Sequence, residues 1–487
     1  MSRVLARIPR DRVTVALAGV LGAGLALRIW FLFVWSPALV GYSDSGVYFQ
    51  DSIQSVWTDP IRTVGYSMFL RVLHGISPHL IFVIIVQHLL GLVTALLYFL
   101  AVRRCGGPRG LGLAPAAIIA LGGDELFIEH SALSDSLFIF LVAAMLYCAI
   151  RASQGRAWWA ALAGLLAGLS VWDRAAGLVL VVAVVPWLLF SLGRPTRRTL
   201  ALALLSLVVW GATVEGYVQW RHAQTGLSGL STNSPWNLYG RVAPWANCSK
   251  FTPPAGTTEL CEYAPASQHV LHSAGAYIYG GSSPAVKLFG APYLISKYPN
   301  AMSLLQKFSE AAILGQPGEY LHAVWLDALR LFNSERQSYS DLSAKELIAY
   351  LLYGPDLHTG LNEFVTSWQV KLYPSDPPPN HGDVGPFVEL ERYTRIEGWP
   401  MVILLALALA APLLAIGRRA RSGATLFALA ALLLIFFPLF ANGFDFRYVI
   451  SAFGPLVAAG AFGAGGLLVR LRPLVQRLRA KPQAAAG

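Results

Sequence analysis

Long apolar runs separated by short polar segments dominate the chain. A helix that crosses the roughly 30 Å hydrocarbon core of a membrane needs about 20 apolar residues. Runs of this kind recur along the sequence and predict about ten membrane-spanning helices, of which the third and fifth are short. The expected spans are 13–35, 80–101, 111–123, 131–150, 157–172, 175–192, 199–215, 398–416, 424–441 and 447–469.

Basic residues gather in every second segment between these spans, with Asp11 as the acid among them. By the positive-inside rule such segments face the cytoplasm, so both termini are expected there, and the first run is expected to be a retained helix. The basic residues concerned are Arg3, Arg7, Arg10 and Arg12; Arg103, Arg104 and Arg109; Arg151 and Arg156; Arg194, Arg197 and Arg198; Arg418, Arg419 and Arg421; and Arg470, Arg472, Arg477, Arg479 and Lys481.

The remaining segments are expected on the outer side of the membrane, and two of them are long. Residues 36–79 form a first outer loop, and residues 216–397 are numerous enough to form a domain with its own core. The pattern thus predicts an all-α polytopic membrane protein with a mixed, partly helical extracytoplasmic domain between helices 7 and 8. Its expected parts are an N-terminal module (1–215), the domain (216–397) and a C-terminal module (398–487), with helices within the domain over 297–314, 317–333 and 342–353.

Composition agrees with a membrane protein and excludes other classes. Of the 487 residues 55% are hydrophobic and only 13% are charged, whereas a soluble domain averages about 25% charged residues. The net charge of +11 would suggest a nucleic-acid partner in a soluble protein. Here the cytoplasmic arginines account for it, so no nucleic-acid partner is expected. Cys248 and Cys261 fall on the oxidising side and are expected to form a disulfide, with a reduced pair as the alternative.

Two charged groups in the first outer loop are candidates for chemistry. Asp44 is flanked by Ser43 and Ser45, which leave room for a substrate, and such a carboxylate can act as a general base on a hydroxyl. The alternative is an N-cap of a juxtamembrane helix. Arg62 can hold a phosphate through its two-pronged guanidinium; alternatively, it extends toward lipid headgroups.

Further charges lie at the outer ends of later spans. Glu129 and His130 precede the fourth span, and Asp135 is expected one turn inside it, where a carboxylate requires a partner. An acid favoured by the helix dipole is the alternative. Arg174 and Arg447 stand at the outer boundary, where arginine is otherwise scarce, and indicate an anionic ligand. Each arginine could instead pair with its neighbouring Asp173 or Asp445.

In order and side, these residues resemble the GT-C superfamily of integral-membrane glycosyltransferases, in particular its protein O-mannosyltransferases and aminoarabinose transferases. The resemblance rests on an acid in the first outer loop, a basic residue before Gly-Tyr, an acidic run at helix 4, an arginine at an outer boundary and Arg-Tyr in the last helix. The residues that carry it are Asp44 and Tyr48; Arg62, Gly65 and Tyr66; Glu129, His130 and Asp135; Arg174; and Arg447, Tyr448 and Pro455.

The resemblance implies transfer of a sugar from a polyprenyl-phosphate donor to an acceptor hydroxyl, with inversion. It implies Asp44 as the general base, and Arg62, Arg174 and Arg447 as ligands of the donor phosphate. Asp135 is expected to order Arg62 or Arg174, or to touch the sugar. The substrate-binding candidates are Tyr48, Tyr66, Glu129, His130 and Tyr448.

The expected partners are the lipid-linked donor, membrane lipid and an acceptor that is a glycan, a lipid or a protein. A monophosphate donor needs less help from a divalent metal than a diphosphate, so no obligatory metal or other cofactor is expected. The expected location is a bacterial cytoplasmic membrane with the site facing outward. A transporter or flippase of a lipid-linked or anionic solute is the alternative, although its usual mid-membrane charges and inverted repeats are not evident in the sequence.

Overall fold

The computed structural model is almost entirely helical in the part of the chain that it describes. The described residues are 11–40, 43–108, 110–191, 193–269, 271–292, 300–332, 359–376, 381–382, 385–396 and 398–480. The helix expected over 342–353 lies outside them. Two short strands, β1 (Trp35–Ser36) and β2 (His381–Gly382), pair antiparallel.

Seven helices of the described chain are long and apolar enough to cross a membrane. The protein is therefore a multi-pass membrane protein. These helices are α2 (Arg12–Val34), α5 (Leu80–Arg104), α8 (Asp135–Gln154), α11 (Arg197–Thr225), α20 (Trp399–Leu414, the end of a candidate span over Arg392–Leu414), α21 (Arg418–Ala441) and α22 (Phe446–Ala480).

Three expected spans form shorter helices. The run 111–123 contains α6 (Leu113–Leu121), and 157–172 becomes α9 (Trp158–Asp173). The run 175–192 divides into a 3-10 helix, η1 (Ala175–Val179), and α10 (Leu180–Phe190). At about 1.5 Å per residue the nine residues of α6 are too short to cross a membrane, and half of them are instead buried against α2, α5 and α22.

The fourth expected span does not begin at residue 131. A separate helix, α7 (Gly123–His130), precedes it, and α8 starts only at Asp135. The break arises because the backbone here pairs with another segment: Leu39 N–H donates to His130 C=O at 2.9 Å, and Ala132 N–H donates to Leu39 C=O at 3.1 Å. Asp135 is therefore the first residue of a helix and not one turn inside it.

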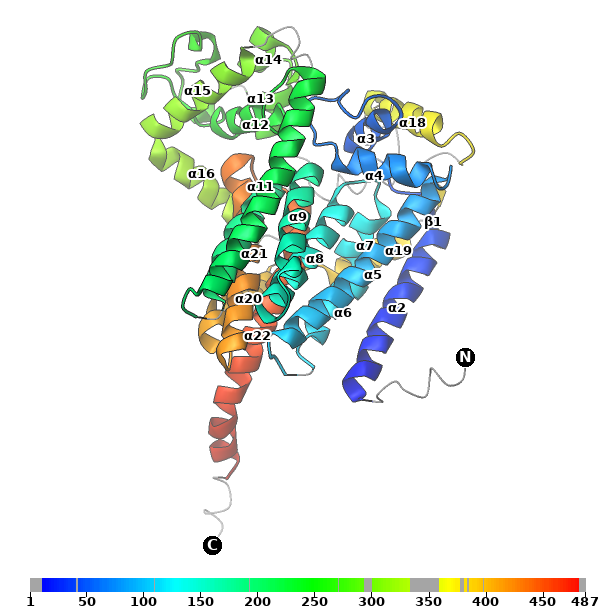
Figure 1. Ribbon diagram of the computed structural model, residues 1–487. Helices are drawn as coiled ribbons and strands as arrows, with labels where there is room; N and C mark the ends of the chain where they lie inside the picture. The colour runs from blue at the N-terminus through cyan, green and yellow to red at the C-terminus, as the bar shows by residue number, and fades with distance from the viewer. Residues whose placement is uncertain are drawn as a thin grey trace.

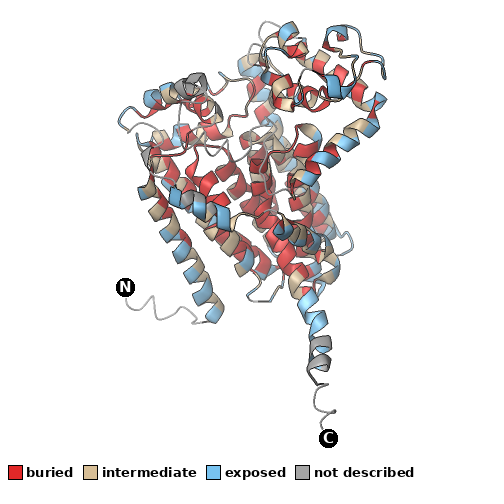
Figure 2. Ribbon diagram, turned by 180° about the vertical axis from the view of Figure 1, so that it is seen from behind, coloured by how far each residue is buried: buried red, intermediate tan, exposed pale blue. Residues whose placement is uncertain are grey.

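The spans pack around a buried centre, with α22 lying along α20 and α21, α8 between α5 and α9, and α11 against α9 (Figure 1). Figure 2 shows buried residues concentrated in this centre and α2 at its side with much of its surface exposed. Both termini lie at one end of the bundle. At the other end, named here the domain end, lie α3 (Ser43–Ile53), α4 (Gly65–His74) and most helices of the 216–397 segment (Figure 1).

The 216–397 segment divides into parts with different neighbours. Its expected boundary at 215 falls inside α11, which continues to Thr225 and ends where Gly226 adopts a left-handed conformation at φ 72°. A first part has its own core and consists of α12 (Asn233–Val242), α13 (Ala274–Tyr279), α14 (Pro284–Phe289) and α15 (Ala301–Gly315), with α16 (Pro317–Arg330) leading back toward α21. In contrast, α18 (Thr359–Leu372) packs against α3, and α19 (Gly385–Thr394) packs against α7 (Figure 1).

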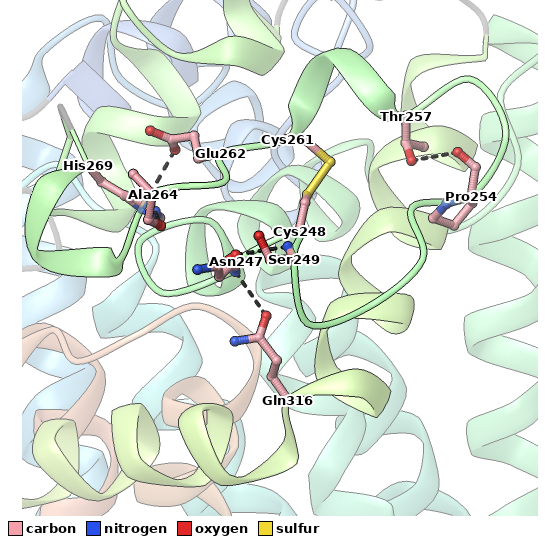
Figure 3. The surroundings of a disulfide bond; sticks show 10 residues. All are labelled: Asn247, Cys248, Ser249, Pro254, Thr257, Cys261, Glu262, Ala264, His269 and Gln316. Carbon is pink, nitrogen blue, oxygen red and sulfur yellow. Dashed lines mark hydrogen bonds and ion pairs between the residues drawn. A yellow bond between two sulfur atoms is a disulfide. The ribbon is translucent and has the colours of Figure 1, made fainter.

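Cys248 and Cys261 are joined by a disulfide in the connection between α12 and α13 (Figure 3). Their Cα atoms lie 5.6 Å apart. The Cys248 N–H donates to the Glu262 carbonyl at 3.1 Å, and the neighbouring Asn247 N–H donates to the side chain of Gln316 at 2.9 Å. The disulfide therefore joins two loop segments, and the Asn247 hydrogen bond fastens the first of them to the start of α16.

Candidate active site

Five charged residues that are far apart in sequence meet at the domain end of the bundle. Asp44 lies in the first turn of α3, and Arg62 lies in the connection between α3 and α4. Asp135 begins α8, Arg174 follows the last residue of α9, and Arg447 lies in the first turn of α22. All five line one cavity. They are named here the cavity cluster.

Within the cavity cluster, acids and arginines alternate. Arg62 donates to Asp44 Oδ1 from Nε at 2.9 Å and from Nη2 at 2.5 Å. Arg447 bridges the two acids, with Nη1 3.2 Å from Asp44 Oδ2 and Nη2 2.8 Å from Asp135 Oδ2. Arg174 pairs with the other oxygen of Asp135. Each acid is thus held by two arginines.

The Arg62 segment is shaped by acids that bind its backbone. Asp59 Oδ2 accepts from the Arg62 N–H at 2.9 Å and from its Nη1 at 3.3 Å. The Asp59 N–H in turn donates to Asp51 Oδ1 at 3.2 Å. Asp59, which is itself held by Asp51, therefore fixes the orientation of Arg62 within the protein.

A close approach between α4 and α9 then brings Arg62 and Arg174 to the same cavity. The Thr63 hydroxyl donates to the backbone carbonyl of Asp173 at 2.8 Å. A Cβ atom at Gly65 would lie 2.6 Å from the Asp173 Cα, which is closer than packed atoms tolerate. Only glycine at position 65 allows this approach without a shift of the backbone, which explains the Gly-Tyr element noted in the sequence.

The two outer-boundary arginines do not direct their guanidinium groups at their sequence neighbours. The carboxylate of Asp445 accepts from the backbone N–H of Arg447 at 2.9 Å, while the guanidinium contacts Asp44 and Asp135. The Arg174 guanidinium contacts Asp135 and lies 5.3 Å from the centroid of the Tyr448 ring. Both arginines therefore face the cavity, as an anionic ligand would require.

The cavity encloses about 1650 Å³ with its open mouth included. Beside the cavity cluster it has an apolar wall from α8, η1 and α21, formed among others by Phe138, Leu178, Leu434 and Phe437. A third wall comes from the 216–397 segment and carries uncharged polar side chains, among them Asn233, Asn237, Tyr279 and Gln306. The cavity therefore suits a ligand with anionic, apolar and uncharged polar parts.

Electrostatics distinguish the acids near the cavity. Burial alone would raise the pKa of the Asp44 carboxyl, but Arg62 and Arg447 outweigh it and hold that pKa below its usual range. By contrast, burial and the nearby Asp59 carboxylate raise the pKa of Asp51 to about 8. The Asp44 side chain is 25% exposed and that of Asp135 only 3%, so Asp44 is the acid that a bound substrate reaches more readily.

The substrate-binding candidates fall into two groups. Tyr48 and Tyr448 line the cavity, and the Tyr48 hydroxyl donates to Ser134 Oγ at 3.1 Å. Tyr66 is fully buried behind Tyr48, with its ring centroid 4.9 Å from the Tyr48 ring. Its hydroxyl donates to the side chain of Gln87 at 2.6 Å. Among the described residues that line the cavity, Tyr66 is not found, so it acts as support for Tyr48.

Glu129 and His130 belong to a separate cluster, named here the buried cluster together with Arg28 and His88. Arg28 donates to Glu129 Oε2 from Nε at 2.7 Å and to Oε1 from Nη2 at 2.5 Å. His88 Nδ1 lies 3.0 Å from Glu129 Oε2, and its Nε2 lies 3.1 Å from His130 Nδ1. None of these four residues lines the described cavity, so the structure separates Glu129 and His130 from the cavity cluster.

Several residues of the buried cluster and of the cavity lining were not identified from the sequence. Arg28 and His88 each interrupt an apolar span, and a lone ionisable residue in such a span is the signal that could have identified them. Asn233, Asn237 and Asn442 also line the cavity, but amides are ordinary in loops and at helix ends, and no sequence signal distinguishes them. Among the described residues no group of three or more His, Cys, Asp or Glu side chains is placed to hold a metal ion.

Comparisons with known proteins find weak structural similarity. No model of a known protein family matches the chain, and no curated protein matches it in sequence. The oligosaccharyltransferase of Archaeoglobus fulgidus in the apo form is similar at a TM-score of 0.47 and 12% identity, covering 97% of this chain and 52% of that one. The chain thus spans about half the length of that enzyme.

Two further solved structures share parts of the arrangement. ArnT from Cupriavidus metallidurans, bound to undecaprenyl phosphate, has a TM-score of 0.35 at 14% identity and covers 94% of this chain and 80% of that one. The S. cerevisiae protein O-mannosyltransferase complex Pmt1-Pmt2, bound to its sugar donor, has a TM-score of 0.35 at 15% identity over 47% and 36% of the two chains. All three are GT-C glycosyltransferases. Because every TM-score is below 0.5, the function proposed next rests on the site itself.

Proposed function

We propose that the protein is a glycosyltransferase that moves a sugar from a polyprenyl-phosphate donor to the hydroxyl of an acceptor. One observation carries the proposal: a reachable carboxylate, Asp44, shares a cavity with three arginines and an apolar wall. Three guanidinium groups suit a phosphate because each offers paired N–H donors to its oxygens. The apolar wall of Phe138, Leu434 and Phe437 suits the isoprenoid chain that carries the phosphate.

The chemical step follows from these positions. Asp44 takes the proton of the acceptor hydroxyl while the oxygen of that hydroxyl bonds to the anomeric carbon of the sugar. The bond from that carbon to the phosphate oxygen breaks on the opposite face, which inverts the centre and releases polyprenyl phosphate. Negative charge grows on the leaving phosphate, so arginines fixed at its oxygens stabilise the transition state more than the bound donor.

The ion pairs of the cavity cluster also determine when Asp44 can act as a base. While Arg62 and Arg447 hold it, the pKa of Asp44 stays low and the carboxylate is a poor proton acceptor. A donor phosphate that draws either arginine away raises that pKa toward its ordinary value. Donor binding thereby activates the base, and Asp135 keeps Arg447 and Arg174 in place meanwhile.

The distribution of basic residues sets the orientation of the site. Arginines flank the spans at the end where the termini lie, and the cavity opens at the domain end. By the positive-inside rule the termini are cytoplasmic and the site faces outward from a bacterial cytoplasmic membrane. In this arrangement 36–79 is the catalytic loop of the N-terminal module, and 216–397 selects the acceptor, which is a glycan, a lipid or a protein. No nucleic acid takes part.

A transfer assay with purified protein in lipid nanodiscs tests the proposal. The probes are undecaprenyl-phosphate sugars with different hexoses and pentoses, and the readout is release of undecaprenyl phosphate in the presence of candidate acceptors, with and without a chelator. Asp44→Asn is expected to lose about 10²- to 10⁴-fold in rate, as expected for removal of a general base. Full activity in Asp44→Asn, or no binding of undecaprenyl phosphate by the wild type, would contradict the proposal.

Glu319→Gln provides the control for that assay. The Glu319 side chain is 39% exposed and pairs with Lys250, and neither residue is among the described residues that line the cavity. The amide removes a carboxylate without changing a described cavity residue, so this variant is expected to retain wild-type transfer.

A further inference from the structure

Asp173 is an acid in the cavity wall without an evident structural role for its carboxylate. It lines the cavity and is 2% exposed. Within the described part of the chain, neither of its carboxylate oxygens has a hydrogen-bond partner. In contrast, the two acids of the cavity cluster, Asp44 and Asp135, are each paired with two arginines.

The docking of α4 does not explain the Asp173 side chain. That contact uses the backbone of Asp173, whose carbonyl accepts from the Thr63 hydroxyl and whose Cα lies under Gly65. The next residue, Arg174, directs its guanidinium to Asp135. A buried polar group without a partner is costly, so a retained one calls for a functional explanation.

Two amides on the same cavity repeat this pattern. Asn442 is 8% exposed and donates from Nδ2 to the Tyr448 hydroxyl at 3.2 Å, while its Oδ1 has no partner among the described residues. The Tyr448 ring lies against the Arg174 guanidinium, which connects Asn442 to the region of Asp173. Asn233, the first residue of α12, likewise has a buried Oδ1 without a partner in the described chain. The two amide oxygens accept hydrogen bonds, and the Asp173 carboxyl, whose pKa is raised by burial, keeps at least one oxygen that accepts.

We propose that Asp173, Asn442 and Asn233 form a sugar-binding wall of the cavity, whose oxygen atoms accept hydrogen bonds from the hydroxyl groups of a sugar. The inference rests on the proposed function and adds the subsite that grips the carbohydrate. Hydroxyl groups are donors without charge, so they can satisfy these oxygens in a cavity that already holds three arginines. A phosphate cannot satisfy the two amide oxygens in this way, because a phosphate oxygen that carries negative charge has no proton to donate. The arginines thus bind the phosphate, and the sugar-binding wall binds the sugar.

Binding measurements separate this role from the phosphate site. Full-length protein in nanodiscs is titrated with undecaprenyl phosphate, and with undecaprenyl-phosphate glucose and undecaprenyl-phosphate mannose. Asp173→Asn and Asp173→Ala are expected to bind undecaprenyl phosphate within about twofold of wild type. Both are expected to lose about tenfold in affinity for the sugar-bearing lipid that the wild type prefers, with Asp173→Ala the weaker, since one hydrogen bond to a buried group accounts for a factor of this size.

A second experimental result would also support the sugar-binding wall, and it would show that the wall binds a sugar of the acceptor substrate instead of the sugar of the donor. In that case the variants bind both lipids normally but raise the acceptor KM about tenfold with little change in kcat. Equal weakening toward both lipids, or no change in either binding or KM, would overturn the inference. Asn442→Ala gives an independent arm with the same expected direction if Asp173 variants do not fold, and Glu319→Gln, at an exposed acid outside the described cavity lining, is the acid-to-amide control. Failure of the wild type to bind undecaprenyl phosphate would instead contradict the proposed function.

Discussion

The cavity cluster and the buried cluster both pair acids with arginines, but the number of arginines on each acid and the space beside the pairs differ. In the buried cluster a single acid, Glu129, meets Arg28, and Arg28 also donates to the carbonyls of Gly24, Ile119 and Ala120. These contacts fix the largely exposed helix α2 to α6 and α7. In the cavity cluster each acid has two arginines, and open space lies beside them.

This difference shows what turns buried charge into a site. An arginine can leave Asp44 for a ligand because a second arginine remains on that acid. Arg28 cannot leave Glu129 without leaving a buried carboxylate to His88 alone. Redundant pairing beside a cavity permits exchange with a ligand, whereas exclusive pairing in a packed interior provides a structural anchor. The two clusters should therefore respond differently to substitution.

The largest expected effect is a loss of stability in the buried cluster. Glu129→Gln keeps the shape of the side chain but leaves the Arg28 charge unpaired in a packed interior. The free energy of unfolding is expected to fall by about 3–5 kcal/mol, the range for breaking a buried pair. Thermal unfolding in detergent checks it, with Glu319→Gln as the control because its pair with Lys250 is exposed. Equal losses in the two variants would contradict the assigned role.

The next effect is a loss of activity in the cavity cluster. Arg447→Met removes the arginine shared by Asp44 and Asp135, and the transfer rate is expected to fall about 10²- to 10³-fold. Stability should fall less than in Glu129→Gln, since Arg62 and Arg174 remain on the two acids. Arg330→Met is the matched control, because Arg330 also shares its acid, Asp327, with a second arginine. A rate equal to that of the control would show that Arg447 is not part of the site.

Substitutions at two glycines, one beside each cluster, test the same difference between the clusters and are expected to have smaller effects. Gly65→Ala places a Cβ 2.6 Å from the Asp173 Cα and should displace Arg62, lowering the transfer rate about tenfold or more. Gly91→Ala places a Cβ 1.8 Å from Glu129 Oε1 and should lower stability by about 1–3 kcal/mol. Steady-state kinetics and thermal unfolding distinguish them. Gly211→Ala, with open space around it, should change neither; the reverse assignment of effects would refute the division.

The smallest effect concerns pH. Asp51 keeps its proton in the folded protein up to a pKa of about 8, whereas an unfolded aspartate loses it near 4. The stability that protonation contributes is therefore full below about pH 4 and is lost as the pH rises through about 8. Asp51→Asn cannot ionise, so its melting temperature should fall less than that of the wild type between pH 5 and pH 8. Parallel curves for the two proteins would exclude the raised pKa.

Much of the architecture could be predicted because it depends on local properties. The length of an apolar run and the arginines at its ends are read directly from the chain, and ten runs correspond to ten helical regions in the structure. The side of the bundle that carries 36–79 and 216–397 follows in the same way. The start of α8 was wrong by four residues because the pairing of Leu39 with His130 and Ala132, a distant contact, decides it.

The site was accessible from the sequence only as a set of candidates. Ionisable residues at the outer boundary of an apolar span are rare, which is why Asp44, Asp135 and Arg447 could be selected. The same criterion also selected Glu129 and His130, which the structure places in the buried cluster. Nothing local distinguishes the two outcomes, since both groups are buried charges at helix ends.

By itself, the sequence determined where the apolar runs lie, their rough extent and the kinds of charge that stand between them. Only the tertiary structure decided which acid meets which arginine, which amides complete the cavity, and that α18 leaves its neighbours to pack on α3. The reason is physical: helix length follows from consecutive residues, whereas the contact between Asp44 and Arg447 joins positions 403 residues apart and exists only once the helices between them have packed.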